Sequence, residues 1–248
     1  MTEDDDLLEE VARNFADRLT TTVYNSVGEG CAPFIAQVAN RAAVIKQSPV
    51  TGIPLVLGDG STLTLVARYH CVLDSHGERL RVQASRFAVY FGDEAAGEPM
   101  FRYDYDSNGT AGLPKAHLQI GDSPENLRAL VALSGEASRR ARKRQQEVDA
   151  GRRLPRADDL HFPVGGDRFR PALEDVLQFL VEALGVPARR GWLGVLKEGR
   201  VDWRERQLAS AVRDNAEAAA AALVELGYLV EPPPGGHPPR RIHHLVDP

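Results

Sequence analysis

The chain lacks the features that mark secreted, disulfide-stabilised and membrane proteins. Its 248 residues include only two cysteines, Cys31 and Cys71, which have no metal-ligand spacing and form no disulfide framework. No apolar run approaches the roughly 20 residues that span a bilayer. The segment MTEDDDLLEE carries six acids and no base, the opposite of a signal peptide. We therefore expect a cytoplasmic protein with no membrane association.

The common signatures of nucleotide and metal sites are also missing. Neither G-x-x-x-x-G-K-[ST] nor G-x-G-x-x-G occurs, and no H-x-H or H-E-x-x-H spacing indicates a metal. The Gly165-Gly166 turn before Arg168 and Arg170 could hold an anion at a helix start, although it matches neither nucleotide-binding motif. We expect no metal and no cofactor.

Acidic residues exceed basic ones, but the charge is uneven. A formal net charge of −5 argues against a protein whose whole surface binds nucleic acid. Residues 136–156 nevertheless carry eight Lys or Arg against three Asp or Glu. This basic run is either a solvated helix or a contact surface for nucleic acid or an acidic partner. The contact residues would be Arg139, Arg140, Arg142, Lys143 and Arg144.

Hydrophobic periodicity predicts an antiparallel meander. Residues 63–73 alternate, the chain turns at His76-Gly77, and a return strand changes phase at Ser85-Arg86, as a β-bulge would. Residues 101–105 and 116–120 alternate in the same way, which gives one apolar face and one polar face. The segment 34–45 fits either a strand or a helix.

Helices are expected on both sides of this meander in the sequence. Apolar residues recur at helical spacing over 3–24 and over 171–184, and residues 123–150 also favour a helix. A last short strand fits 160–164. We predict an α+β fold for residues 1–186, in which helices pack on the meander and a basic helical insert occupies about 123–156.

Residues 187–248 predict a small helical subdomain. Two helices break at Asp214-Asn215, and YLV and RRIHHLV could form two strands around a Pro/Gly loop, an order similar to a winged helix. The second helix has no Lys or Arg, which a DNA-reading helix needs. This favours a structural or protein-binding subdomain, with Arg240 and Arg241 keeping the alternative open.

Strand alternation places several functional side chains on the polar face of the meander. They could bind a metal, or they could act on a phosphate by acid–base chemistry. In the second case His117 or His161 is the acid/base, Asp104 orients it, and Arg102, Arg168 and Arg170 hold phosphate. The alternative is an ordinary solvated face with no function. The residues that alternation places there are Arg68, His70, Arg102, Asp104, His117 and His161.

The order FRYDYD, KAHLQI and LHFPVGGDRFRPALEDVLQFL, within residues 62–184, resembles an uncharacterised actinobacterial protein family. More distantly it is similar to TumE-like proteins, which are assigned as toxins in toxin–antitoxin pairs. The resemblance implies a bacterial defence locus, a cognate helix-turn-helix antitoxin or other protein partner, and RNA as a target. Two hypotheses follow: a defence or toxin–antitoxin component acting on RNA, or a non-enzymatic regulatory module that binds protein or nucleic acid.

Overall fold

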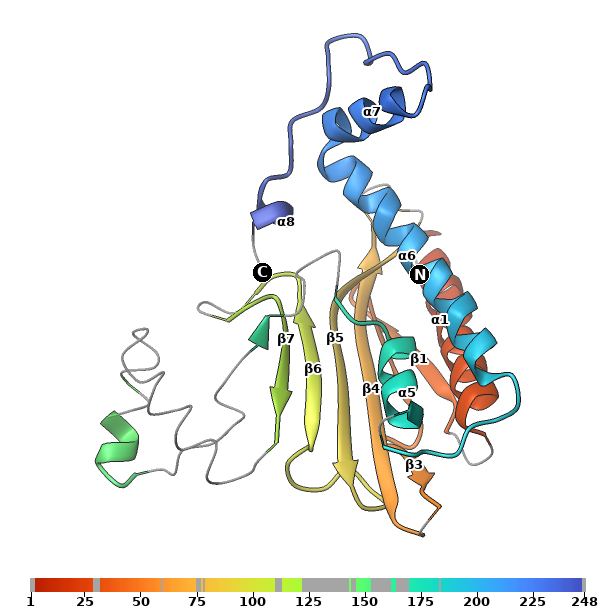
Figure 1. The fold of residues 1–248 in the computed structure, drawn as a ribbon, viewed down its shortest axis with the longest axis vertical. Coiled ribbons are helices and arrows are strands. Elements are labelled where there is room, and N and C mark those ends of the chain that lie inside the picture. Colours follow the sequence, from red (N-terminus) through yellow and green to blue (C-terminus); the bar gives the residue numbers. More distant parts are fainter. Residues whose placement is uncertain are drawn as a thin grey trace.

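The computed structural model describes residues 3–28, 32–58, 60–74, 77, 79–109, 113–121, 143, 146–152, 162–163, 170–182 and 184–246. Within these ranges, eight antiparallel strands form one sheet and helices cover one of its faces (Figure 1). The chain therefore has the expected α+β fold. The strands are β1 (Phe34–Ala39), β2 (Ala42–Gln47), β3 (Ile53–Val56), β4 (Thr62–Leu73), β5 (Leu80–Phe91), β6 (Phe101–Asp106), β7 (Ala116–Ile120) and β8 (Phe162–Pro163).

The strands follow the meander predicted from the sequence, extended by three short strands near the N-terminus. The sheet order is β1-β2-β4-β5-β6-β7-β8. β2 and β3 pair with the same edge of β4: β3 pairs with its first half and β2 with its second half. β1 and β2 form a hairpin in which Asn40 and Arg41 both have positive φ, 52° and 59°. This is the geometry of a two-residue type I′ turn, so the segment 34–45 is a hairpin rather than a helix.

The predicted change of phase is present, but it lies earlier in the chain. His70 pairs with Ala84 while Cys71 pairs with Val82, so Gln83 is the extra residue of the bulge. Ala84 therefore points to the polar face, and Ser85 is already in phase with Phe87. The expected slip at Ser85-Arg86 was wrong by two residues, because a small alanine fits either face of a sheet.

Two helices cover the apolar face of the sheet, and a third packs across them. α1 (Glu3–Val27) and α5 (Leu173–Glu182) lie on the sheet, and α6 (Trp192–Asp214) contacts both. The side chain of Asp175 accepts a hydrogen bond from the Ala172 N–H at 2.9 Å and closes the first turn of α5. α5 is shorter at each end than the predicted 171–184 helix, since Pro171 and Leu184 lie outside it.

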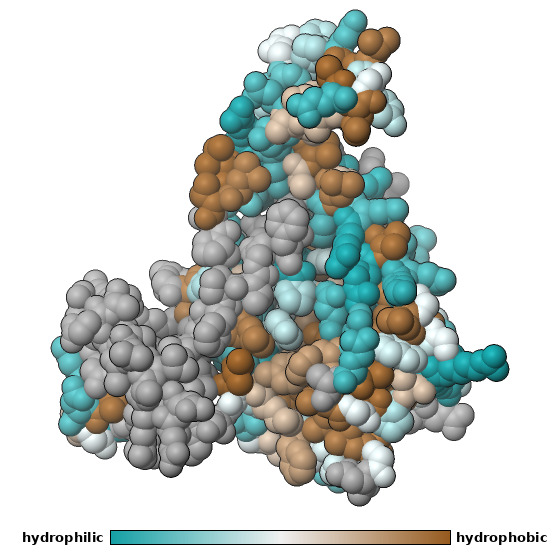
Figure 2. Space-filling view, viewed as in Figure 1, coloured by the Kyte–Doolittle hydropathy of each residue, from teal (hydrophilic) through white to brown (hydrophobic). Residues whose placement is uncertain are grey.

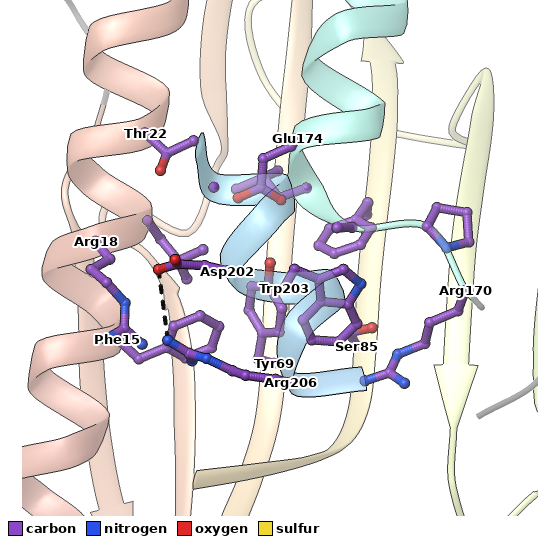
Figure 3. Close-up of a pocket in the computed structure, with 16 residues that line it drawn as sticks. Phe15, Arg18, Thr22, Tyr69, Ser85, Arg170, Glu174, Asp202, Trp203 and Arg206 are labelled. Atoms are coloured by element: carbon purple, nitrogen blue, oxygen red, sulfur yellow. Dashed lines mark ion pairs between the residues drawn. The ribbon is translucent and has the colours of Figure 1, made fainter. Parts of the chain in front are cut away.

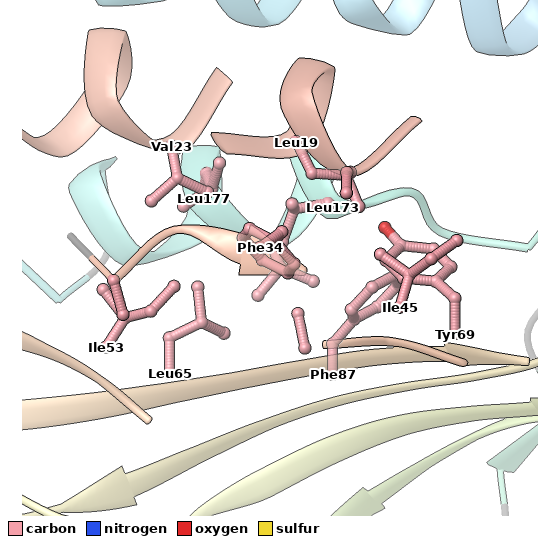
Figure 4. Packing of buried hydrophobic residues seen from close by; sticks show 14 of the residues in the cluster. Leu19, Val23, Phe34, Ile45, Ile53, Leu65, Tyr69, Phe87, Leu173 and Leu177 are labelled. Atoms are coloured by element: carbon pink, nitrogen blue, oxygen red, sulfur yellow. The ribbon is translucent and has the colours of Figure 1, made fainter. Parts of the chain in front are cut away.

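The hydrophobic core lies between this helical layer and the sheet (Figure 4). The buried stripe of α5 faces alternate residues of β4 and β5, as the periodicities of helix and strand require. Cys71 is also part of this core, and its burial raises the pKa of the thiol to about 12. The thiol is therefore an unreactive packing group. Central members of the core are Leu19, Val23, Ile45, Leu65, Phe87, Leu173 and Leu177.

The C-terminal region is helical, but it does not form the expected pair of strands. α6 ends at Asp214 and α7 (Ala216–Glu225) follows, which confirms the predicted break. Residues 228–242 contain neither helix nor strand, and His243–Val246 form a helical turn, α8. The strand prediction was wrong because Pro232–Pro234 and Pro238-Pro239 remove the N–H donors of a ladder. A winged helix is therefore not supported.

Some of the predictions lie outside the described residues. Of the predicted basic insert at 123–156, the structure describes Lys143 and residues 146–152, of which Lys143 and 146–149 are helical. The predicted strand at 160–164 is described only as β8, which pairs with β7. Among the described residues, no helix has the length and apolar character needed to cross a bilayer.

Leu177 provides a direct test of the core. It is fully buried beneath α5, so Leu177→Ala removes contacts and leaves a cavity, and we expect unfolding free energy to fall by about 2–5 kcal/mol. Leu208→Ala is the matched control, because Leu208 is 66% exposed on α6. Urea denaturation measures both. Equal losses for the two variants would contradict this packing.

Candidate functional site

A row of charged side chains crosses the face of the sheet that the helices leave uncovered. Direct register pairs Lys46 with Arg68, Arg68 with Arg86, Arg86 with Asp104, and Asp104 with His117. Residues directly opposite in an antiparallel sheet point to the same face, with strands about 4.8 Å apart. These five residues from β2, β4, β5, β6 and β7 are called the charged row.

Asp104 is the electrostatic centre of the charged row. Its Oδ1 accepts a hydrogen bond from Arg86 Nε at 2.7 Å, and its Oδ2 pairs with Arg102 Nε at 3.0 Å. Arg102 Nε also donates to the side-chain oxygen of Gln119, its directly opposite partner on β7. The Asp104 carboxylate is 13% exposed, so water screens these contacts only in part. Asp104 thus holds two guanidiniums in place on the sheet.

His117 lies at the end of the charged row and is nearly buried, at 8% exposure. Its Nδ1 lies 2.9 Å from the backbone oxygen of Pro114. A carbonyl only accepts hydrogen bonds, so Nδ1 carries the proton and Nε2 has the lone pair when the ring is neutral. Nε2 lies 3.9 Å from Asp104 Oδ2, which is too far for a hydrogen bond. The Pro114 carbonyl, rather than Asp104, orients the ring.

The other end of the charged row brings like charges together. Lys46, Arg68 and Arg86 are consecutive cross-strand neighbours, and Arg68 and Arg86 are both exposed. Like charges directly opposite one another destabilise a sheet. Beside them, partial burial and the Arg68 charge lower the pKa of His70, which favours its neutral form. The three basic side chains make the surface suited to an anion that offsets their repulsion.

The structure brings together some of the predicted site residues and separates others. Arg102, Asp104 and His117 form one cluster on the polar face, as alternation predicted. Arg170 lies on the opposite, helix-covered face, where its guanidinium stacks 3.6 Å from the ring centre of Tyr105. Lys143 is exposed. The remaining predicted residues, His161, Arg168, Arg139, Arg140, Arg142 and Arg144, lie outside the described residues.

Arg170 instead lines a cavity that the sequence patterns did not reveal (Figure 3). The cavity lies between α1, α5, α6 and the sheet. The Arg170 guanidinium also lies 4.7 Å from the ring centre of Trp203 on α6. Arg170 occupies the irregular segment before α5, so strand alternation cannot place it. Other lining residues missed by sequence reasoning are Arg18, Tyr69, Glu174, Asp202 and Arg206.

The charged row has the groups needed to bind a phosphodiester and to move a proton. Guanidiniums suit phosphate oxygens, and a histidine with a fixed tautomer suits general acid–base chemistry. Among the described residues, no three His, Cys, Asp or Glu side chains gather in a way that could hold a metal ion. Arg86 and Gln119 were overlooked from the sequence. Continuing the alternation from Phe87 and from Leu118 places both on the polar face.

No protein-family model, no curated protein and no solved structure matches the chain. The resemblance to TumE-like proteins therefore stays a prediction. Function is inferred from the fold and from the geometry of these side chains.

Asp104→Asn tests the electrostatic role of Asp104. The amide keeps the shape but loses the charge that balances Arg86 and Arg102, so we expect a loss of about 1–3 kcal/mol in unfolding free energy. Salt should recover part of the loss by screening the guanidiniums. Asp93→Asn, at an exposed position, is the control. A salt-independent loss, or no loss, would contradict the role, as measured by denaturation at two ionic strengths.

Proposed function

We propose that the chain is a cytoplasmic bacterial defence or toxin–antitoxin type component that acts on RNA through the charged row. The observation that carries this proposal is the alignment of Lys46, Arg68 and Arg86 in direct register, in the same row as Asp104 and His117. Such an alignment costs stability, and a bound phosphate backbone would offset the cost. The same face carries the candidate acid/base.

The charge of this face differs from that of the whole chain. Among the strand residues that the register places on this face, Lys46, Arg68, Arg81, Arg86 and Arg102 supply five positive charges, and Asp104 and Asp106 supply two negative charges. Counting the histidines as neutral, the balance is +3. The chain as a whole has a formal net charge of −5. A local positive surface on an acidic protein attracts phosphates while the remaining surface repels them, which confines RNA to this face.

The proposed chemistry is cleavage of an RNA phosphodiester. Nε2 of His117 takes the proton of a ribose 2′-hydroxyl as that oxygen attacks the adjacent phosphorus. The bond to the 5′-oxygen breaks, which leaves a 2′,3′-cyclic phosphate, and this oxygen takes a proton from water. The remaining hydroxide takes the proton held by His117, so the protons balance. Arg102, held by Asp104 and Gln119, stabilises the charge on the phosphate oxygens. The 2′-hydroxyl requirement makes RNA rather than DNA the substrate.

Binding to the charged row is tested with labelled single-stranded RNA and fluorescence anisotropy. Affinity should fall steeply between about 50 and 200 mM salt, and Arg68→Gln should lower the salt slope by about 0.7, the value for one phosphate contact. Arg13→Gln, an exposed residue on α1, is the matched control and should change nothing. Identical slopes for both variants would refute the assignment of RNA to this face.

A second candidate function is a protein-interaction module, and the C-terminal arm favours it. The arm comprises the end of α6, α7 and residues 226–246. The end of α6 and α7 project away from the sheet, and the following segment turns back to α8 (Figure 1). α7 has no buried residue, although it is rich in Ala, Leu and Val. Apolar residues are visible over the arm in Figure 2. The large exposed ones are Leu223, Val224, Leu226, Tyr228, Leu229, Ile242, Leu245 and Val246.

Polar contacts hold parts of the arm together while its apolar surface stays exposed. Asp214 is fully buried, and its carboxylate accepts a bond from His244 Nδ1 at 2.8 Å. Its backbone oxygen accepts the Arg241 N–H, and Arg240 pairs with Glu217 at 2.6 Å. These contacts tie the C-terminal segment back to α6 and α7. An exposed apolar surface on an ordered arm is typical of a partner-binding site, and a cognate antitoxin is the partner proposed for it.

Growth on expression of the full chain separates the two functions. If the chain cleaves RNA, expression slows growth and His117→Ala relieves the effect, while Leu229→Glu leaves it intact because Leu229 lies on the arm. If the chain acts only by binding a partner, Leu229→Glu relieves the effect and His117→Ala does not. Circular dichroism controls for folding. Unchanged toxicity of a folded His117→Ala variant would refute the catalytic role.

A further inference from the structure

The cavity on the helix-covered face contains buried polar groups that the fold leaves unpaired. It has a volume of about 90 Å³, and Tyr69 of β4, Glu174 of α5 and Asp202 of α6 line it (Figure 3). This cavity is separated from the charged row by the sheet itself, because Arg68 and Tyr69 are consecutive residues on opposite faces. Its chemistry is therefore independent of the proposed action on RNA.

Tyr69 has a buried hydroxyl with no partner. The residue is 5% exposed, and its ring packs edge-on against Phe15 at 5.1 Å and Phe87 at 5.5 Å. No hydrogen bond joins its oxygen to any residue within the described ranges. Burial first, and the nearby Glu174 charge second, raise the pKa of Tyr69 well above its usual value, so the hydroxyl keeps its proton. A buried hydroxyl without a partner is unfavourable unless a ligand or water pairs with it.

Glu174 has a buried carboxyl in a similar position. It is 8% exposed, and α6 approaches so closely that a Cβ on Gly199 would lie 2.6 Å from Oε1. Arg200 makes no side-chain hydrogen bond to this carboxyl, since its guanidinium bonds Asp175 at 2.8 Å and Gln178 at 2.7 Å; its charge lowers the pKa of Glu174, but burial has the larger effect. Within the described part of the chain, the carboxyl bonds only its own backbone N–H, and its burial raises its pKa. A cationic donor would satisfy it as a carboxylate.

Arginines also line this cavity: the buried Arg170 stacks on Tyr105 and Trp203, and two further arginines lie at the mouth. Arg18 of α1 and Arg206 of α6 lie on its two sides, and burial together with the charge of Arg206 lowers the pKa of Arg18. Asp202 lies 3.9 Å from Arg206 and balances one of the two guanidiniums. One positive charge remains in excess at the mouth, at the edge of a wall that includes the Phe15 and Trp203 rings.

We propose that this cavity binds a small aliphatic α-amino acid as a zwitterion. Its ammonium group donates to the Glu174 carboxylate and the Tyr69 oxygen, and its carboxylate pairs with Arg18 and Arg206. Its aliphatic side chain packs on Trp203. The cavity volume is about 90 Å³ and one water takes about 30 Å³ in the liquid, so the cavity suits a small molecule. Valine and leucine are small molecules with an aliphatic side chain and both charged groups.

Other ligand classes satisfy fewer of these groups. A simple anion pairs with the arginines but leaves Glu174 and Tyr69 unsatisfied, and a simple amine leaves the excess charge at the mouth. A nucleotide has more than about 20 non-hydrogen atoms, well above the capacity set by the cavity volume. The acidic and basic groups of the cavity, together with its small volume, therefore favour an amino acid over these other ligand classes.

Isothermal titration of the full chain with matched small molecules tests the proposal. L-valine and L-leucine should bind. Isovalerate, which lacks the ammonium group of valine, and isobutylamine, which lacks its carboxylate, should each bind at least about tenfold more weakly, as expected for loss of a charge-assisted bond. Absence of binding by both amino acids, or equal binding of isovalerate, would overturn the proposal.

Substitutions then assign the binding to this cavity. Glu174→Gln and Arg206→Gln should each weaken valine binding at least about tenfold, and Tyr69→Phe should weaken it less because it removes one neutral bond. Arg204→Gln, an exposed residue on the same helix outside the cavity, should leave affinity unchanged. Equal weakening by Arg204→Gln and Arg206→Gln would overturn the assignment. If a variant fails to fold, the titrations of the unaltered chain with the amino acids, isovalerate and isobutylamine still test the proposal.

Discussion

The pairing register of β4, β5, β6 and β7 determines what each face of the molecule contains, because successive residues of a strand point to opposite sides. With this register, Tyr69, Phe87 and Tyr105 lie beneath the helices, and Arg68, Arg86 and Asp104 lie on the uncovered face. The alternation of β5 changes phase at the Gln83 bulge, so its apolar side chains stay on the covered face along the whole strand. A shift of one residue would bury the charges and expose the core.

Both faces hold groups that folding alone does not favour. On the uncovered face three basic side chains are neighbours in register, and on the covered face Tyr69 and Glu174 are buried without partners suited to them. Stability would improve if either set were replaced by ordinary packing residues. Local conflicts of this kind are typical of binding sites, where a ligand supplies the missing interaction. They are the physical basis for both proposals.

The sequence predicted those parts of the fold whose periodicity is long. The helix at 3–24, the meander and the helix at 171–184 each extend over enough residues for one period to prevail, and α1, β4–β7 and α5 confirm them. The segment 34–45 was too short for its hydrophobic pattern to distinguish a strand from a helix. The prediction of C-terminal strands was wrong because YLV and RRIHHLV alternate, but the prolines between them lack the N–H donors that a strand ladder needs.

The candidate site was predictable only where strand alternation applies. It placed Arg102, Asp104 and His117 together, but it could not show that Arg86 and Arg102 share Asp104 or that Pro114 orients His117. Arg170 and the cavity depend on how α6 packs across α1 and α5, and this packing leaves no pattern in the sequence.

The central claim is that RNA binds the uncovered face of the sheet along the charged row. NMR spectra of the full chain with a short single-stranded RNA test it most directly. The account predicts that backbone amide shifts concentrate at Arg68, Arg86, Asp104 and His117, with α7 unchanged. Shifts confined to α7 and the remainder of the C-terminal arm, with none in β4–β7, would contradict it.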